Sequence, residues 1–299
     1  MTSVLEYITN NPQETKRLIG IDYDSLEQLI KQAVAVEEQN IVVNEKEKVR
    51  IIKPGGGRKP KLSATEQILL TLVYLHHLPT FQMLGVQFGV SESTAHKLFH
   101  YWSNILRELL PASLLEQVKK NDLDWEWVKE LLVEWELVVD SSEQVRERPK
   151  LYQEQKKFYS GKKKNHTLKN QLIVLPNGAE IVDVTVGKPG PSSDINLFRA
   201  RQAEFAANQK FKGDKGYIGE MQIETPHKKP KKSELTPEQK EENKQISAQR
   251  IVIEHVIRLV KIFRVAQERF RLRPQSYERV ILTVCGLVRL RVGALILPT

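Results

Sequence analysis

The sequence predicts an all-α N-terminal half followed by a half of the α+β or α/β class, built on a mixed sheet. Up to Glu136 apolar residues recur at helical spacing, whereas β-branched and alternating segments begin at Leu137. The charge changes at the same place, because residues 1–136 carry 15 basic and 19 acidic side chains and residues 137–299 carry 31 and 18. This basic excess is interleaved with strand and helix patterns. It therefore predicts a folded surface for nucleic acid, with a merely solvated basic face as the alternative.

The composition excludes several other classes of protein. A chain of 299 residues with 40% apolar residues is expected to form about two globular domains. Its one cysteine, Cys285, cannot form an internal disulfide, which fits a reducing compartment. The N-terminus lacks the pattern of a signal peptide, and the longest apolar stretch, 280–297, contains Arg289 and Arg291. We therefore expect a cytoplasmic protein without membrane segments, associated with the nucleoid when it is bound to DNA.

The N-terminal region, 1–57, is expected to be a helical segment followed by a linker. Residues 24–39 have the periodicity of an amphipathic helix, but nothing in them indicates a role. The segment KPGGGRKPKLS at 53–63 contains glycines and prolines that exclude regular structure. Within it, Arg58, Lys59 and Lys61 are candidates for an arm lying in a minor groove, and a solvated linker is the alternative.

Residues 58–112 are predicted to form a helix-turn-helix domain that binds DNA. The pattern favours a buried helix from Thr65 to Leu78, a second from Thr80 to Gly89, and a third from its N-cap Ser91 to Leu110. Gly89 permits the left-handed turn between the last two helices. An ordinary three-helix bundle is the alternative. In the first interpretation, the residues near the start of the third helix face the major groove: Ser93, Thr94, His96 and Lys97.

Residues 137–299 are predicted to form a ribonuclease H-like catalytic domain, reached through a helical connector at 113–136 in which Trp125, Trp127 and Trp135 pack. The expected strands cover 137–140, 166–175, 179–187 and 210–214, with a hairpin turn at 176–178 and a helix from Ser192 to Phe205. A helix at 250–263 and one or two helices at 277–296 follow. Between them, the polar, proline-containing residues 220–248 predict a basic insertion that is flexible unless bound.

Three carboxylates are the candidate catalytic and metal-binding residues of this domain. Asp140 is expected to end the first strand and Asp214 the fourth, which would lie beside it, so that the two meet at neighbouring strand ends. Glu254 lies on the helix at 250–263, with the phosphate-binding candidates Arg258 and Lys261 on the same face. Oxygen ligands without cysteines or clustered histidines favour Mg²⁺, with Mn²⁺ as a substitute, and exclude zinc. Two such ions about 3.5–4 Å apart would suit phosphodiester chemistry.

Six motifs in order along the chain resemble those of DDE transposases of bacterial insertion sequences, specifically the insertion-sequence family numbered five, which is related to the Harbinger elements. They are VVDSSE (138–143), SGKKKNHTLKNQ (160–171), PGPSSDINLF (189–198), GDKGYIG (213–219), TPHKKPK (225–231) and RIVIEHVIRLVKIFR (250–264). The resemblance covers roughly residues 58–290. It implies that Asp140, Asp214 and Glu254 are the acidic triad of a magnesium-dependent, ribonuclease H-like enzyme. It also implies a homo-oligomer that works on paired DNA ends.

Further basic residues and one further acid fall near this site. Four lysines lie just before and within the second strand and are candidates for gripping the DNA that flanks the cut: Lys162, Lys163, Lys164 and Lys169. Asp194 is a rival ligand, but its position just after Ser192 favours a role at a helix N-terminus.

The function predicted is that of a transposase. It binds the terminal inverted repeats of its element as double-stranded DNA, cleaves there, and uses the freed 3′-hydroxyl to attack target DNA. A domesticated transposase-derived nuclease is one alternative. A non-catalytic helix-turn-helix regulator is another, which the filled acidic positions disfavour.

Overall fold

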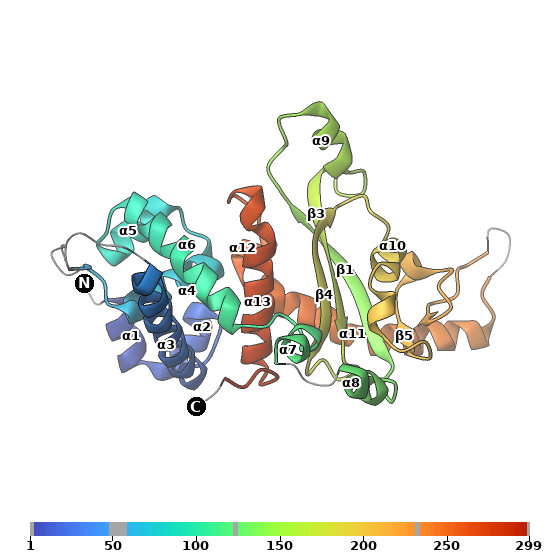
Figure 1. Cartoon of the computed structure of the whole chain (residues 1–299). Coiled ribbons are helices and arrows are strands. Elements are labelled where there is room, and N and C mark those ends of the chain that lie inside the picture. Colours follow the sequence, from blue (N-terminus) through green and yellow to red (C-terminus); the bar gives the residue numbers. More distant parts are fainter. Residues whose placement is uncertain (1–2, 48–58, 122–124, 231–233, 298–299) are drawn as a thin grey trace. The chain divides into compact units, whose positions relative to one another are not determined.

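The computed structural model describes residues 3–47, 59–121, 125–230 and 234–297, which form two compact units (Figure 1). The first unit comprises residues 1–110 with 263–265 and 295–299, and the second comprises residues 111–262 and 266–294. Arg58, of the predicted basic arm, lies outside the described residues.

The first unit is all helical, as predicted. Its helices are α1 (Val4–Asn10), α2 (Thr15–Ile19), α3 (Tyr23–Glu47), α4 (Ala64–His77), α5 (Phe81–Phe88) and α6 (Glu92–Leu109). Helix α4 forms the centre of the unit, because eight consecutive residues from Ile68 to Leu75 are buried. Ser63 and Glu66 form a capping box at its start.

Helices α5 and α6 form the predicted helix-turn-helix. Thr80 caps α5 and Ser91 caps α6, each hydroxyl accepting a backbone N–H three residues on. Between them Gly89 has φ 67°, a left-handed conformation that a side chain would strain. The α5 ring of Phe81 stacks on Tyr74 of α4, with centroids 4.6 Å apart, so the two helices are fixed to the α4 scaffold.

The second unit is built on a sheet with the strand order β2-β3-β1-β5-β6, in which β4 also pairs with β3. The strands are β1 (Leu137–Val145), β2 (Tyr159–Ser160), β3 (Asn165–Val174), β4 (Ile181–Pro189), β5 (Phe211–Lys212) and β6 (Ile223–Glu224). The three long strands are antiparallel, and β5 joins β1 in parallel. This confirms the predicted mixed sheet of a ribonuclease H-like domain.

Strand β1 is longer than predicted, because it continues past Asp140 to Val145. Asp140 therefore lies within the strand and not at its end. What ends near Asp140 is the pairing with β5, which links Leu137 to Phe211 and Val138 to Lys212. Beyond Val138, β1 no longer pairs with β5, so this edge of the strand can carry a site. On its other edge β1 stays paired with β3 as far as Val145.

Two helical segments between strands differ from the prediction. Helix α9 (Tyr152–Phe158), in the connection from β1 to β2, has no counterpart in it. Helix α10 (Asp194–Arg199) is shorter than the predicted 192–205, and a 3₁₀ turn at Gln202–Glu204 follows it. Ser193, not Ser192, is the N-cap of α10, and its side chain makes no capping hydrogen bond.

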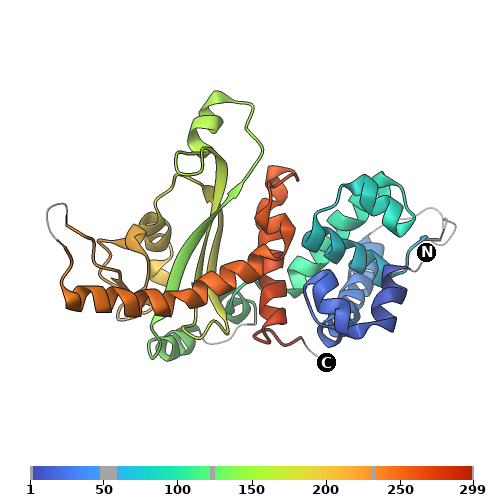
Figure 2. The same ribbon diagram turned by 180° about the vertical axis from the view of Figure 1, so that it is seen from behind.

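Helix α11 (Pro237–Lys261) crosses the sheet in Figure 2 and is much longer than the predicted 250–263. Its N-terminal half occupies the last part of the predicted insertion, 220–248. Thr236 and Gln239 form a capping box there, with Pro237 at the first helical position, so regular structure begins at the end of a polar segment.

The final helix, α13 (Tyr277–Arg291), carries a buried arginine that ties three elements of the second unit together. The Arg289 guanidinium is fully buried and donates two hydrogen bonds, of 2.6 and 2.7 Å, to the Glu180 carboxylate. It also donates to the Pro111 carbonyl at 2.8 Å and to the Gln117 side chain of α7 (Leu114–Lys120) at 2.7 Å.

The connector contains α7 and α8 (Trp125–Leu132). Trp125 packs against the sheet core, as predicted. Trp127 and Trp135 are 59% and 47% exposed, so the expectation that they pack is wrong for both. Trp127 is two residues from Trp125 on α8 and so points to another side of the helix, and Trp135 follows the end of α8.

Among the described residues, no helix has the length and apolar character needed to span a membrane.

Candidate active site

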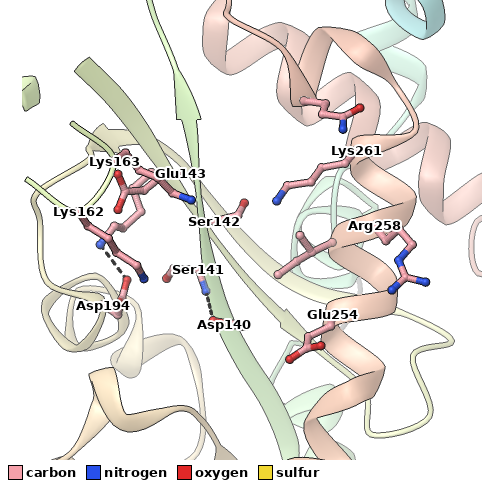
Figure 3. A pocket seen from close by; sticks show the side chains of 13 residues that line it. Asp140, Ser141, Ser142, Glu143, Lys162, Lys163, Asp194, Glu254, Arg258 and Lys261 are labelled. Carbon is pink, nitrogen blue, oxygen red and sulfur yellow. Dashed lines mark hydrogen bonds and ion pairs between the residues drawn. The ribbon is translucent and has the colours of Figure 1, made fainter. Parts of the chain in front are cut away.

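The candidate active site is a cavity of about 500 Å³ on the second unit (Figure 3). It lies between β1, the segment leading into β3 and the first half of β3, the start of α10 and the C-terminal part of α11. Its charged lining residues are Asp140, Glu143, Lys162, Lys163, Lys169, Asp194, Glu254, Arg258 and Lys261. Two of the three predicted catalytic residues, Asp140 and Glu254, thus face one space together with five basic side chains.

Asp140 is held by its own strand and by an arginine on α11. One carboxylate oxygen accepts the Ser141 N–H at 2.7 Å, and the other lies 3.4 Å from Nη2 of Arg250. Burial raises the pKa of Asp140, and the nearby carboxylates of Asp214 and Asp194 add to this, while the Ser141 N–H and Arg250 oppose it. A cation near Asp140, in addition to Arg250, would favour the charged carboxylate and so oppose this rise in pKa.

Asp214 does not line the cavity, but the sheet register places it beside Asp140. Extending the parallel pairs Leu137 with Phe211 and Val138 with Lys212 by two residues aligns Asp140 with Asp214. The Asp214 carboxylate is turned into its own 3₁₀ turn, where it accepts the Gly216 N–H at 2.7 Å. It is close enough to Asp140 to raise the pKa of that residue.

Gly216 separates two acidic side chains. A Cβ at this position would stand 2.8 Å from an Asp214 oxygen and 2.9 Å from an Asp194 oxygen. Any side chain here would therefore displace both carboxylates, which explains the glycine in GDKGY. The Asp194 and Asp214 carboxylates consequently both lie within 3 Å of the position that a Gly216 Cβ would occupy.

Glu254 projects from α11 with Arg258 and Lys261, as the helical spacing predicted (Figure 3). The opposite side of the helix is buried through Ile253 and Val256. Burial lowers the pKa of Lys261, and the nearby Lys163 lowers it further. Two cations that repel each other across a cavity favour an anion between them.

Three of the four predicted gripping lysines line the cavity. Lys162 and Lys163 are exposed and belong to the turn between β2 and β3, whereas Lys169 is buried within β3. Lys164 takes part in the same turn, with φ 51°, but is not among the lining residues.

Asp194 lies in the first turn of α10, as predicted, and it also has a partner that the prediction lacked. Its carboxylate forms an ion pair with Lys169 at 3.0 Å, and the Lys169 ammonium also donates to the Ser192 carbonyl at 2.5 Å. Asp194 therefore compensates a buried lysine at the wall of the cavity. Its position in the sequence could not reveal this partner.

A buried polar network behind the cavity was missed by the sequence analysis. The Gln171 amide donates to the Tyr217 hydroxyl at 3.0 Å and to the Asp194 carbonyl at 2.9 Å, and the Tyr217 hydroxyl lies 3.1 Å from the Ser141 hydroxyl. Burial raises the pKa of Tyr217, so the phenol stays protonated. The network joins β1, β3 and the turns that carry Asp194 and Asp214. The signal for it in the sequence is the polar residue within each motif, Gln171 in HTLKNQ and Tyr217 in GDKGY.

The helix-turn-helix residues lie on the first unit. Ser93, His96 and Lys97 are exposed, and Thr94 is half-buried. The Thr94 hydroxyl lies 2.8 Å from the hydroxyl of the N-cap Ser91, so one of its hydrogen bonds is made within the cap. The Nε2 atoms of His96 and His100 lie 3.1 Å apart. Lys59 and Lys61 line a cavity of about 360 Å³ with Ser91 and Thr94, and Lys61 donates to the Gly89 carbonyl at 3.2 Å. Lys59 and Lys61 thus border the start of α6.

The chemistry of the donors fits a hard divalent cation. Asp140 and Glu254 supply carboxylate oxygens to one cavity, and Asp214 lies beside Asp140, without a cysteine or histidine in the cavity lining. In the described parts of the chain, no three acidic, histidine or cysteine side chains are gathered into a complete ligand shell. Arg250 lies against Asp140 and supplies part of the positive charge there.

Both parts of the chain match described protein families. Residues 139–289 match the DDE superfamily endonuclease family, and residues 60–112 match the helix-turn-helix of DDE superfamily endonuclease. The probable transposase for insertion sequence element IS702 of Microchaete diplosiphon is 37% identical to the chain over 225 residues, covering 74% of this chain and 78% of that protein.

Two solved structures of the Mos1 transposase are also similar. The paired-end complex with the left transposon end has 15% identity, covers 80% of this chain and 89% of that chain, and has a TM-score of 0.20. The pre-cleavage transpososome has 14% identity, the same coverage and a TM-score of 0.18. Similarity this low assigns no role to any residue of this chain.

Proposed function

Because this chain belongs to the family of DDE transposases of insertion sequences, we propose that it binds the terminal inverted repeats of its own element, cleaves DNA there and joins the freed 3′ end to target DNA. It is a DNA-binding, DNA-cleaving enzyme of that family. The observation that supports the proposed chemistry best is the single cavity in which Asp140 and Glu254 lie among five basic side chains. Carboxylates for a divalent metal and cations for phosphates are the two requirements of phosphodiester cleavage.

Asp140, Asp214 and Glu254 would hold the metal. Two Mg²⁺ ions held there would supply activation of the attacking oxygen and stabilisation of the leaving one, and Mn²⁺ would serve similarly. The chain's own residues then position the DNA. We expect Lys162, Lys163, Arg258 and Lys261, which line the cavity, to contact phosphates, whereas Lys169 is paired with Asp194.

Arg250 is expected to compete with the metal for Asp140. In Arg250→Gln the metal-free protein loses the partner of a partly buried carboxylate, so divalent binding should tighten. The expected gain is about fivefold, which corresponds to about 1 kcal/mol for one charged contact. Isothermal titration with Mn²⁺ would measure the affinity. Arg250→Lys, which keeps the charge, is the matched control and should bind Mn²⁺ like the unchanged protein. Equal or weaker Mn²⁺ binding in Arg250→Gln would show that the arginine does not compete.

The start of α6 is expected to read the element ends. Lys97→Ala, or Ser93→Ala combined with Thr94→Ala, should weaken binding to end DNA by about 1–3 kcal/mol per lost base contact and relax specificity. Ser91 would remain as the cap, so the helix should persist. Gel-shift titration with end DNA and with random DNA, alongside circular dichroism of each variant, provides the measurement. Unchanged affinity for both DNAs would assign recognition to another surface.

Magnesium-dependent cleavage of labelled element-end DNA tests the proposed function as a whole. A non-catalytic regulator would bind the ends without cutting them. A domesticated nuclease would cut without joining ends to a target. We further propose that the active form is a homo-oligomer on paired ends, which light scattering of the complex with DNA would measure.

A further inference from the structure

The connection from β1 to β2 carries a second cavity, distinct from the active site. It has a volume of about 360 Å³ and is lined by Arg148, Tyr152, Gln155, Lys156, Tyr159 and His166, which we call the α9 pocket. In Figure 1, α9 stands beyond the end of the sheet, away from the other helices of the second unit. None of the predicted site residues belongs to this pocket.

The pocket is built from ordered contacts within the connection. The Gln155 amide nitrogen donates to the Pro149 carbonyl at 2.9 Å, and Arg148 donates to the Gln155 side-chain oxygen at 2.8 Å. Phe158, the last residue of α9, is buried, and its ring centroid lies 4.3 Å from the guanidinium carbon of Arg146. These contacts hold the segment that forms the pocket walls in place.

Its walls combine aromatic rings with cations. Tyr152 is 76% exposed and Tyr159 is 46% exposed, and the Tyr159 ring meets the His166 ring at 5.6 Å. Partial burial lowers the pKa of His166, with Arg148 and Arg146 adding to the effect, so this ring is uncharged at neutral pH. An exposed tyrosine beside Arg148 and Lys156 is the combination that stacks a base and contacts its phosphate.

Charge and position both favour DNA as the occupant. Residues 146–164 carry eight basic and two acidic side chains. Lys162 and Lys163, which line the active-site cavity, are three and four residues after Tyr159 of the α9 pocket, so one short basic segment contributes to both cavities. Val145 is five residues beyond Asp140 on β1. Along the strand, Asp140 and Val145 are therefore about 17 Å apart, which equals the length of about five base pairs of B-DNA.

We propose that the α9 pocket binds an unpaired nucleobase of the DNA strand flanking the cleavage site, by stacking on Tyr152 and Tyr159 with Arg148 and Lys156 at the neighbouring phosphates. The proposal rests on the proposed function, because that function supplies the DNA. A cavity of this volume lies within the range of about 300–1,000 Å³ for small-ligand pockets. A second copy of the chain is the other class of occupant, and the experiment separates the two.

Single-stranded binding by the full chain tests the proposal. The probe is a labelled oligothymidylate of about 12 nucleotides, within the range of single-strand sites, with a blunt duplex of equal length as the comparison. Tyr152→Ala and Tyr159→Ala should each weaken oligothymidylate binding about 5- to 150-fold, the equivalent of about 1–3 kcal/mol per stacked base. Duplex binding should change less than twofold. Tyr152→Phe and Tyr159→Phe keep the ring and should bind like the unchanged protein.

Tyr7→Ala, at an exposed tyrosine of the first unit, is the matched control and should have no effect. Equal oligothymidylate affinity in the tyrosine-to-alanine variants and the unchanged protein would overturn the proposal. So would a change in oligomeric state by light scattering without a change in affinity, which would assign the pocket to a second copy. Because Tyr152 is so exposed, its replacement does not endanger the fold.

The outcome of this experiment does not depend on cleavage. An enzyme that cleaves DNA but whose α9 pocket does not bind oligothymidylate contradicts this inference alone. Tyrosine-dependent binding in a protein that never cleaves contradicts only the proposed function.

Discussion

Replacing Asp140 or Asp214 by asparagine, or Glu254 by glutamine, is expected to lower DNA cleavage and joining by orders of magnitude. Each change keeps the shape of the side chain and removes one negative charge from a site proposed to hold two divalent cations. Metal affinity and the positioning of the attacking oxygen should both suffer. Binding to end DNA should persist, because α5 and α6 lie on the other unit and fewer acids repel the phosphates. A cleavage assay in Mg²⁺ on labelled end DNA, paired with a gel shift, measures both.

Two further carboxylates calibrate this experiment. Glu241 lies on the same helix as Glu254 but outside the cavity, in a surface pair with Lys244, so Glu241→Gln should cleave normally. Asp194→Asn should retain part of the activity, because its loss leaves the buried Lys169 without its carboxylate but removes no proposed metal ligand. Full activity in any of the three triad variants, or complete loss in Asp194→Asn alone, would refute the assignment.

Arg289→Met is expected to destabilise the second unit by about 3–5 kcal/mol, because it leaves the Glu180 carboxylate without its buried partner. The loss should reach beyond one ion pair, since the Pro111 carbonyl and the Gln117 side chain also lose a donor. Urea unfolding followed by circular dichroism would give the change in the free energy of unfolding.

The double variant Arg289→Met with Glu180→Leu is the matched control. Removing both charges should restore most of the stability, because an apolar pair of similar volume avoids the cost of burying ions. A loss below about 1 kcal/mol in the single variant, or a double variant no more stable than the single one, would show that the pair is not the source of the effect.

The sequence predicted those elements that begin and end with strong local signals. Ser63, Thr80 and Ser91 cap α4, α5 and α6, and Gly89 forms the left-handed turn, as their residue types indicate. The N-terminal half of α11 was missed although TPEQ at 236–239 is a capping box. The residues after it are polar on every side, so there was no apolar period to find. Helix α9 has seven residues and no capping hydrogen bond, so little in its sequence distinguishes it from a loop.

The sequence allowed us to predict which residues line the candidate site, but not which ion pairs they form. Asp140, Glu254, Arg258 and Lys261 line one cavity, as strand and helix periodicity suggested. The pair of Lys169 with Asp194 and the pair of Asp140 with Arg250 join residues 25 and 110 positions apart in the chain. No local pattern encodes such partners, because they depend on how the sheet, α10 and α11 pack together.

The Arg289 network also has a consequence for the timing of folding during synthesis. Its partners Pro111, Gln117 and Glu180 precede Arg289 by 178, 172 and 109 residues. At about 5–20 residues per second, a ribosome that has made Glu180 needs about 5–20 s more to deliver the guanidinium that neutralises it. During that interval the sheet edge carrying Glu180 holds a carboxylate whose burial is unfavourable, so the second unit should complete its packing only after α13 has emerged. In a nascent chain interrupted before α13, the second unit should therefore stay incompletely packed and sensitive to proteases. Proteolysis should then remove partial chains faster than full-length ones.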